Sequence, residues 1–227
     1  MNNQDKAPQD ITPNLPLWSY QLQQNSKLAV KTRKDLEIYL ITRALKDEKF
    51  RQDLVANPKA IVEKELGKKL PEELKIKVLE ETENTIYMVF PCNPYEGLPE
   101  EELRASLGMT YEDVAQWVLD QQRSVFIDKE SSVKLIAQAW RNEVFKHALL
   151  HEPITLIQEM YGDNILEALK GIKLQVYIES INTLCIVVPH NLMLSVDSIV
   201  IYEEVLNMPM VIGCASNMTS CCMTNNC

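Results

Sequence analysis

The residue types that could do chemistry are concentrated at the end of the chain, in residues 213–227. Four of the six cysteines lie there, interleaved with four hydroxyl residues. No charged residue follows Glu204, although 24% of the chain is charged. A segment so small and polar cannot bury enough surface to offset its conformational entropy, so it is not part of a core. We interpret it as a substrate with the reactive residues Cys214, Ser216, Thr219, Ser220, Cys221, Cys222, Thr224 and Cys227.

Thiols and hydroxyls in equal number on a short segment are compatible with thioether formation, which is one of several fates that the residues alone leave open. In that chemistry an enzyme dehydrates each hydroxyl residue to an alkene, and a thiolate then adds to the alkene. Closing rings over a few residues costs little chain entropy. Disulfide formation after export is a second possibility, and an unmodified tail is a third. A zinc site is less favoured, because Cys221 and Cys222 are adjacent and no histidine follows them.

Composition restricts the rest of the chain to a globular class. With 227 residues, 46% of them apolar, a packed core is expected. The net charge of -9 argues against nucleic acid or an anionic membrane as a partner. Residues 1–10 lack the apolar stretch of a secretory signal, and no apolar run is long enough to span a bilayer. Cysteine is sparse outside the tail, which fits a reducing compartment, so we predict a cytoplasmic protein.

An α+β unit is predicted to begin near residue 31. Apolar spacing predicts three short helices, with Asp47 capping the second. Asn57-Pro58 begins the third helix and Gly67 ends it. The period then changes, and two strands around a turn at residues 83–84 predict a hairpin that ends at Phe90.

The same order of helix caps, breakers and apolar positions occurs a second time further along the chain. Residues 40–50 align with residues 135–145, Pro58 with Pro153, and Gly67 with Gly162. After a three-residue insertion, Pro91 aligns with Pro189. Because caps, breakers and apolar positions coincide, we predict two tandem copies of one unit.

The first unit carries a many-position pattern that resembles a known family. Its parts are Asp47-Glu48-x-Phe50-Arg51-x-x-Leu54, Asn57-Pro58-Lys59-Ala60, Leu66-Gly67, Glu81-x-x-x-Thr85 and Val89-x-Pro91. This pattern resembles the nitrile hydratase-like leader peptides, which precede the core peptides of ribosomally made, modified natural products, the proteusins and related lanthipeptides. The resemblance covers residues 35–107 well and 133–206 more loosely. Two features depart from it: leaders normally hold one such unit, and the usual double glycine is here Ile212-Gly213.

The resemblance implies a domain order and a division of labour. Residues 1–30 would be a flexible N-terminal segment and 31–124 the first leader unit with its following helices. Residues 125–213 would be the second unit and linker, and 214–227 the core peptide of a bacteriocin-like product. A lanthionine synthetase or another modifying enzyme would bind the leader, and a peptidase-containing exporter would cut near Gly213. The docking candidates are Leu98, Leu103, Leu107, Leu194 and Val196.

The resemblance also raises an enzyme reading, because nitrile hydratase α subunits hold iron or cobalt in a Cys-x-x-Cys-Ser-Cys claw. The equivalent places here are Phe90-Pro-Cys92-Asn-Pro-Tyr and Val188-Pro-His190. One thiol or one imidazole cannot assemble that claw, so we predict no enzyme, no catalytic residue, no metal and no cofactor. We predict that Cys185 is an unreactive thiol in the core. The aromatic residues of the helical patterns are expected in the core: Trp117, Trp140 and Phe145.

A binding or scaffold module with an unmodified tail is the alternative from another class. The acidic run Glu100-Glu101-Glu102 is compatible with both hypotheses, the precursor and the scaffold module. It can be a solvated helix face, or it can meet a basic groove on a modifying enzyme and raise the association rate.

Overall fold

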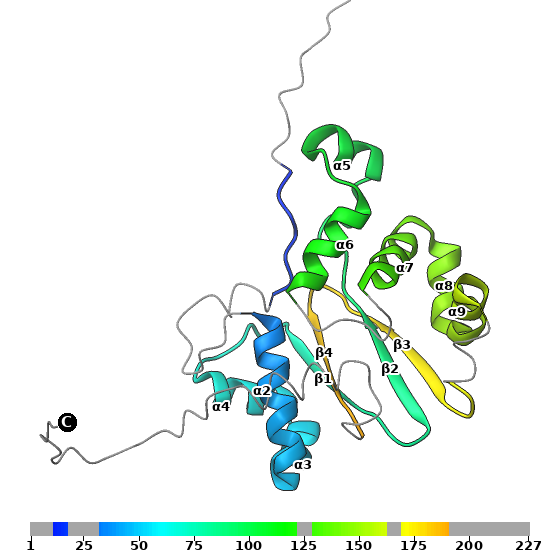
Figure 1. Cartoon of the computed structure of the whole chain (residues 1–227). Coiled ribbons are helices and arrows are strands. Elements are labelled where there is room, and N and C mark those ends of the chain that lie inside the picture. Colours follow the sequence, from blue (N-terminus) through cyan, green and yellow to red (C-terminus); the bar gives the residue numbers. More distant parts are fainter. Residues whose placement is uncertain (1–10, 18–31, 122–128, 163–168, 191–227) are drawn as a thin grey trace, which may run out of the picture.

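The structure, a computed structural model, describes residues 11–17, 32–121, 129–162 and 169–190 (Figure 1). It is an α+β protein, as predicted. No helix in these ranges is long and apolar enough to cross a bilayer. In chain order the elements are α2 (Arg33–Lys46), α3 (Glu48–Ala56), α4 (Pro58–Leu66), β1 (Lys75–Glu80), β2 (Thr85–Phe90), α5 (Glu100–Leu107), α6 (Tyr111–Asp120), α7 (Lys129–Arg141), α8 (Glu143–His151), α9 (Pro153–Tyr161), β3 (Lys173–Ile178) and β4 (Thr183–Val188).

Three helices followed by two strands occur twice in this order. Helices α3 and α8 begin at Glu48 and Glu143, 95 residues apart, and α4 and α9 keep the same separation. Strands β1 and β3 begin at Lys75 and Lys173, 98 residues apart, and β2 and β4 keep that separation. We call α2–β2 the first unit and α7–β4 the second unit.

Local sequence signals set the helix ends in both units. The Asp47 carboxylate accepts a hydrogen bond from the Phe50 amide and caps α3, as expected. In the second unit the Asn142 side chain caps α8 in the same way. A proline opens α4 and another opens α9. Gly67 ends α4 with a φ of 70°, a left-handed conformation that favours glycine.

The predicted hairpin does not form a paired ladder. Strand β1 pairs in parallel with β4 of the second unit, and β2 pairs in parallel with β3. Between the two strands of the first unit, the described contacts include one antiparallel bridge, from Thr82 to Thr85. Each unit therefore exchanges strands with the other. The alternating pattern had predicted the strands correctly but assigned them the wrong partners.

Equivalent hydrogen bonds mark both ends of each strand pair. The Lys75 amide donates to the Asn182 carbonyl at 2.8 Å, and its counterpart Lys173 donates to Asn84 at 2.7 Å. At the other end, the amides of Glu81 and Glu179 each donate at 2.9 Å to the last residue of the partner strand. The strand pairing and the hydrogen bonds at its ends are thus reciprocal between the first and the second unit.

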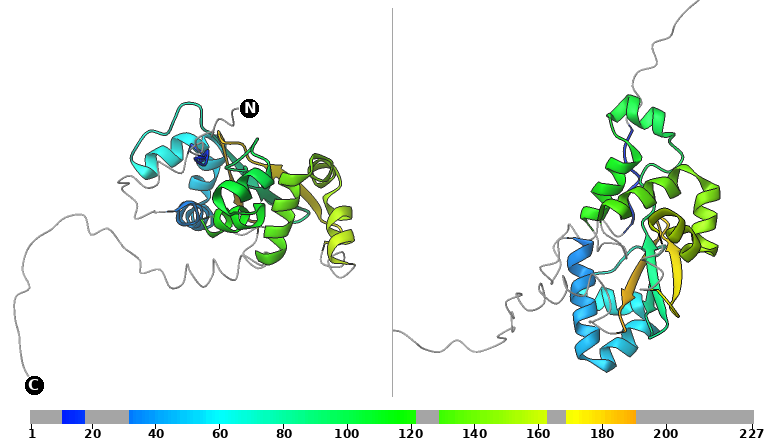
Figure 2. Two further views of the ribbon diagram at one scale, coloured as in Figure 1. Left: turned by 90° about the horizontal axis from the view of Figure 1, so that it is seen from above. Right: turned by 45° about the vertical axis from the view of Figure 1, so that its right-hand side comes forward.

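Two apolar cores result, and each contains strands from both units. The helices of the first unit pack on β1 and β4, burying Ile76 together with Leu184, Ile186 and Val188. The helices of the second unit pack on β3 and β2, burying Leu174 and Val176 together with Met88 and Phe90. Figure 2 shows the strands between the two sets of helices. A hairpin would have placed both strands of a unit against the same three short helices.

A buried ionic group also joins the units. The Arg33 guanidinium of α2 donates to both carboxylate oxygens of Glu179, at 2.6 and 2.8 Å, and to Glu37 at 2.7 Å. Burial acts to lower the pKa of Arg33, but the two carboxylates outweigh it and raise that pKa. Burial is also the largest influence on Glu179 and raises its pKa, against the opposing effect of Arg33. Removing one partner of such a group typically costs about 3–5 kcal/mol, because it leaves a buried charge uncompensated.

Residues 11–17 lie against both units. The Asn14 amide donates to the Pro94 carbonyl at 2.7 Å, and the Leu17 amide donates to Ile181 at 3.1 Å. The Leu17 side chain packs on the core of the first unit. This part of the predicted lead-in therefore bridges the loops that follow β2 and β3.

Strand exchange predicts that the two units stay together when the chain between them is cut. A protease site inserted within residues 122–128 would separate the first unit from the second covalently. We expect both fragments to elute together at the size of the intact chain, because each core needs strands from both. They should separate only in denaturant. Two fragments that elute as independently folded monomers in buffer would contradict the observed pairing.

Candidate docking and modification sites

The residues predicted to be modified lie outside the described part of the chain. The same holds for the predicted cleavage residue and for two of the predicted docking residues. These residues are Leu194, Val196, Gly213, Cys214, Ser216, Thr219, Ser220, Cys221, Cys222, Thr224 and Cys227. Their roles stay predictions from the sequence.

The other predicted docking residues belong to helix α5 and the turn before it. Leu103 has an exposed fraction of 0% and packs with Tyr111, Val114 and Ala137. Leu98 is half-buried against the same cluster. Leu107, in the last turn of α5, is 40% exposed. Of the three, Leu107 presents the largest apolar surface to solvent, while Leu103 holds the helix in place.

Helix α5 projects from the body and offers a mostly exposed surface (Figures 1 and 2). Pro99 precedes its first turn, and three consecutive glutamates suit the positive end of the helix dipole. Gly108 ends it with a φ of 68°. A capping box between Thr110 and Asp113 then starts α6. The acidic helix predicted over residues 98–108 is therefore present.

Arg141, the last residue of α7, fixes the position of α5 and α6. Its Nε and one Nη donate to the two oxygens of Glu100 at 2.6 Å, and it also donates to Glu112 at 2.6 Å. Hydrogen bonding to Arg141 lowers the pKa of Glu100 to about 2. Glu100 also accepts from the Tyr111 amide at 3.0 Å. The first acid of the run is thus structural, whereas Glu101 and Glu102 are exposed and available to a partner.

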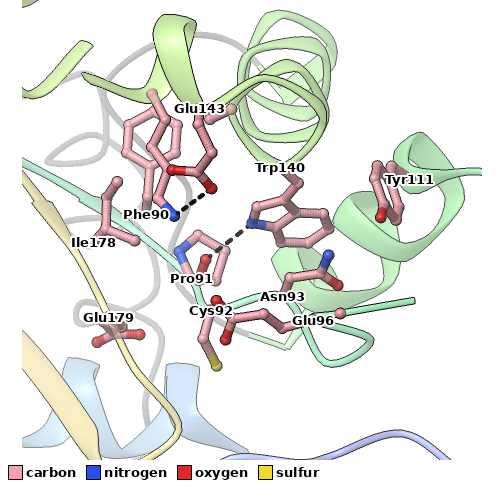
Figure 3. Close-up of a pocket in the computed structure, with 13 residues that line it drawn as sticks. Phe90, Pro91, Cys92, Asn93, Glu96, Tyr111, Trp140, Glu143, Ile178 and Glu179 are labelled. Atoms are coloured by element: carbon pink, nitrogen blue, oxygen red, sulfur yellow. Dashed lines mark hydrogen bonds and ion pairs between the residues drawn. The ribbon is translucent and has the colours of Figure 1, made fainter. Parts of the chain in front are cut away.

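A pocket with a volume of about 140 Å³ lies at the loop equivalent to the metal-holding claw of nitrile hydratase α subunits, between residues 90–97 and helices α7 and α8 (Figure 3). The Trp140 indole donates to the Pro91 carbonyl at 3.4 Å and forms one wall. The Cys92 sulfur points away from Trp140. Burial raises the pKa of Cys92 to about 12, so the thiol stays protonated at neutral pH.

These residues do not fit a bound metal. Metal ligation needs a thiolate, and Cys92 is one buried thiol followed by Asn93 and Pro94. Within the described ranges, no group of three or more histidine, cysteine or acidic residues is arranged to hold an ion. In the second unit His190 occupies the equivalent place, and its Nε2 lies 4.0 Å from a carboxylate oxygen of Glu83.

Cys185 is buried, as predicted, and burial raises its pKa to about 12. Trp140 and Phe145 pack on the core of the second unit, also as predicted. Trp117 differs: it is 38% exposed and lies beside Leu15 and Pro16. Its helical spacing predicts a core residue, so this prediction is only partly met.

Comparison with known proteins supports the family resemblance over the first unit. A model of the family described as nitrile hydratase, alpha chain, matches residues 42–109. The chain is 37% identical over 68 residues to Polytheonamide B of Bacterium symbiont subsp. Theonella swinhoei (strain pTSMAC1). That alignment covers 28% of this chain and 47% of the relative, so the chain spans about half the length of the protein it matches. The predicted resemblance to the nitrile hydratase-like leader peptides is confirmed for this region.

The hydrogen-bonded ion pair between Arg141 and Glu100 predicts a pH-dependent contribution to the free energy of unfolding. The pKa of Glu100 is lowered in the folded protein, so its contribution is present above the usual pKa of 4.5 and is lost as the pH falls toward about 2. We expect Arg141→Gln to lower Tm at pH 6 by on the order of 2 °C, since the group is partly exposed. The difference should shrink between pH 4.5 and pH 2. Lys146→Gln, which removes a contact to the exposed Glu143, is the control. A difference in Tm that does not change with pH would contradict this role for Glu100.

Proposed function

We propose that this chain, which resembles the nitrile hydratase-like leader peptides in its first unit, is the precursor of a ribosomally made, post-translationally modified peptide. The observation that carries the proposal is the similarity over 68 residues to Polytheonamide B, in the region that resembles the leader peptides of the proteusins. In this chain that region precedes a tail rich in cysteine and hydroxyl residues. The leader is not catalytic: its role is to bind a modifying enzyme.

The chemistry we propose for the tail is thioether formation by a lanthionine synthetase. Each of Ser216, Thr219, Ser220 and Thr224 would lose its β-hydroxyl and its α-proton, with the net release of one water. A thiolate of Cys214, Cys221, Cys222 or Cys227 would then form a bond to the β-carbon, and a proton would return to the α-carbon. The second step leaves the mass unchanged. Cleavage near Gly213 by an export-coupled peptidase would release the product from its cytoplasmic precursor.

The folded leader serves this chemistry by tethering. Once the leader is bound, the tail is held at high effective concentration near the catalytic centre, so the tail's own sequence need not provide the affinity. We propose helix α5 as the docking element. It offers Leu107 and the exposed carboxylates of Glu101 and Glu102 on one projecting helix, while Leu103 and Glu100 hold the helix in place. A rigid exposed helix is suited to bind a groove, because little ordering entropy is lost.

Thioether formation is tested by the intact mass of the protein purified from its native cells, under conditions where the genes next to its own are expressed. We expect the loss of up to four waters, with tail cysteines that no longer react with an alkylating reagent after denaturation and reduction. Cys92 and Cys185 should react under the same conditions and serve as an internal control. Replacing the four tail hydroxyl residues by alanine should abolish the mass loss and leave the fold intact. An unmodified mass with six reactive thiols would favour the scaffold module.

A matched pair of variants tests the docking element. Leu107→Glu should weaken binding of the modifying enzyme by about tenfold, as expected for loss of an apolar contact in an interface. Val144→Glu makes the same change at a residue of α8 that is 79% exposed, and it should leave binding unchanged. Binding can be measured by titration, with Tm as a check on folding. Equal affinities for the two variants would place the docking surface elsewhere.

A further inference from the structure

Helix α8 carries two of the three histidines of the chain on one face. His147 and His151 are four residues apart, a spacing that makes two side chains neighbours on a helix. Both residues are exposed. Helix α8 lies in the outer part of the second unit, away from the first unit (Figure 1). The proposed function gives these two histidines no role.

The two imidazole rings are stacked on one another. Their centroids are 4.0 Å apart, and their planes are 15° from parallel. The Nδ1 atom of His151 lies 2.9 Å from the carbonyl oxygen of His147. A carbonyl oxygen can only accept, so Nδ1 carries the proton of this hydrogen bond. In the neutral ring of His151 the lone pair is then on Nε2, at the tip of the side chain.

This arrangement suits a divalent ion of a first-row transition metal. Imidazole nitrogen is a preferred ligand of Zn²⁺, Cu²⁺ and Ni²⁺. Histidines that bind such ions commonly donate their other ring nitrogen to a backbone carbonyl, as His151 does. Two metal–nitrogen bonds of about 2.0–2.1 Å each allow one ion to join nitrogens up to about 4 Å apart. Rings with centroids 4.0 Å apart reach this geometry by small rotations of their side-chain torsions.

We infer that His147 and His151 together bind one divalent transition-metal ion on the surface of α8. The ion joins two consecutive turns at the end of the helix. Within the described ranges, no third histidine, cysteine or acid lies close enough to complete the site. Water or a group of another molecule therefore occupies the other coordination positions. The inference does not depend on the proposed precursor function.

The pair is a feature of the second unit. At the positions 95 residues earlier, helix α3 of the first unit has Gln52 and Ala56. The family model ends at residue 109, before α8 begins. The expectation of no metal rests on the missing claw, and the spacing of His147 and His151 is a separate signal. Its meaning depends on the helical conformation of α8 and on the exposure of this face.

Titration of the full chain with Ni²⁺, followed by calorimetry, tests the site. All proteins carry serine at the four tail cysteines, because thiolates bind the same ions. We expect one Ni²⁺ ion per chain. Exchanging two neighbours, His151→Glu with Glu152→His, keeps the composition but moves the second imidazole off the face of the first. The affinity should fall by at least about tenfold, because the second imidazole no longer adds to an ion that the first one holds.

Two further variants guard against a change in folding and against binding elsewhere. His147→Asn should lose affinity to the same extent as the exchange, and circular dichroism checks that each variant is folded. His190→Asn removes the third histidine and should bind Ni²⁺ like the parent chain. Excess Mg²⁺, which prefers oxygen ligands, should not displace Ni²⁺.

Three results would overturn the inference. One is a parent chain that binds no Ni²⁺ at millimolar concentration. Another is an exchange variant with the affinity of the parent, which would show that the ion does not need the pair. The third is displacement of Ni²⁺ by Mg²⁺, which would place the ion on carboxylates instead of imidazoles.

Discussion

The exchange of strands between the two units is the constraint on which the rest of the structure depends. Three short helices and two six-residue strands are too little to form a core alone, because small domains bury too small a share of their surface. Here each set of helices is completed by one strand of its own unit and one strand of the other. Neither core can form before both units have been made. We therefore expect folding to be a single cooperative event that depends on contacts between residues about a hundred positions apart.

Charged groups reinforce this exchange where the two units meet. Arg33 reaches from the first helix of one unit to Glu179, at the end of β3 in the other. Glu179 also accepts from the Cys185 amide, just as Glu81 accepts from the Tyr87 amide in the first unit. Glu81 and Glu179 thus hold the turn between the two strands of their units in the same way. Only Glu179 also binds Arg33 among the described contacts. On the outside, Arg141 of the second unit holds the helices that follow the first. The ionic contacts are asymmetric even though the strand pairing is symmetric.

The sequence predicted the elements well because their signals are local. Asp47, Pro58 and Gly67 act within one turn of chain, and alternation of Ile76 and Val78 with lysines identifies a strand without reference to its neighbours. Partner choice is not local, since a period of two says which face is buried but not what covers it. The hairpin was therefore wrong although the strands were right. The same limit applies to α5, where helical spacing cannot tell that Leu103 is buried and Leu107 exposed until the position of α7 is known.

Under the proposed function, the folded part of the chain also bears on how the tail is modified. A disordered leader would lose conformational entropy each time it bound an enzyme, whereas a folded helix such as α5 is already ordered. The effective concentration of the tail then depends on the length of chain between the docking surface and each reactive residue. Because the reactive residues follow one another from Cys214 to Cys227, the tether from α5 would lengthen along the tail, and the effective concentration would fall toward Cys227. The order in which an enzyme reached the hydroxyl residues would then follow their distance from α5 along the chain.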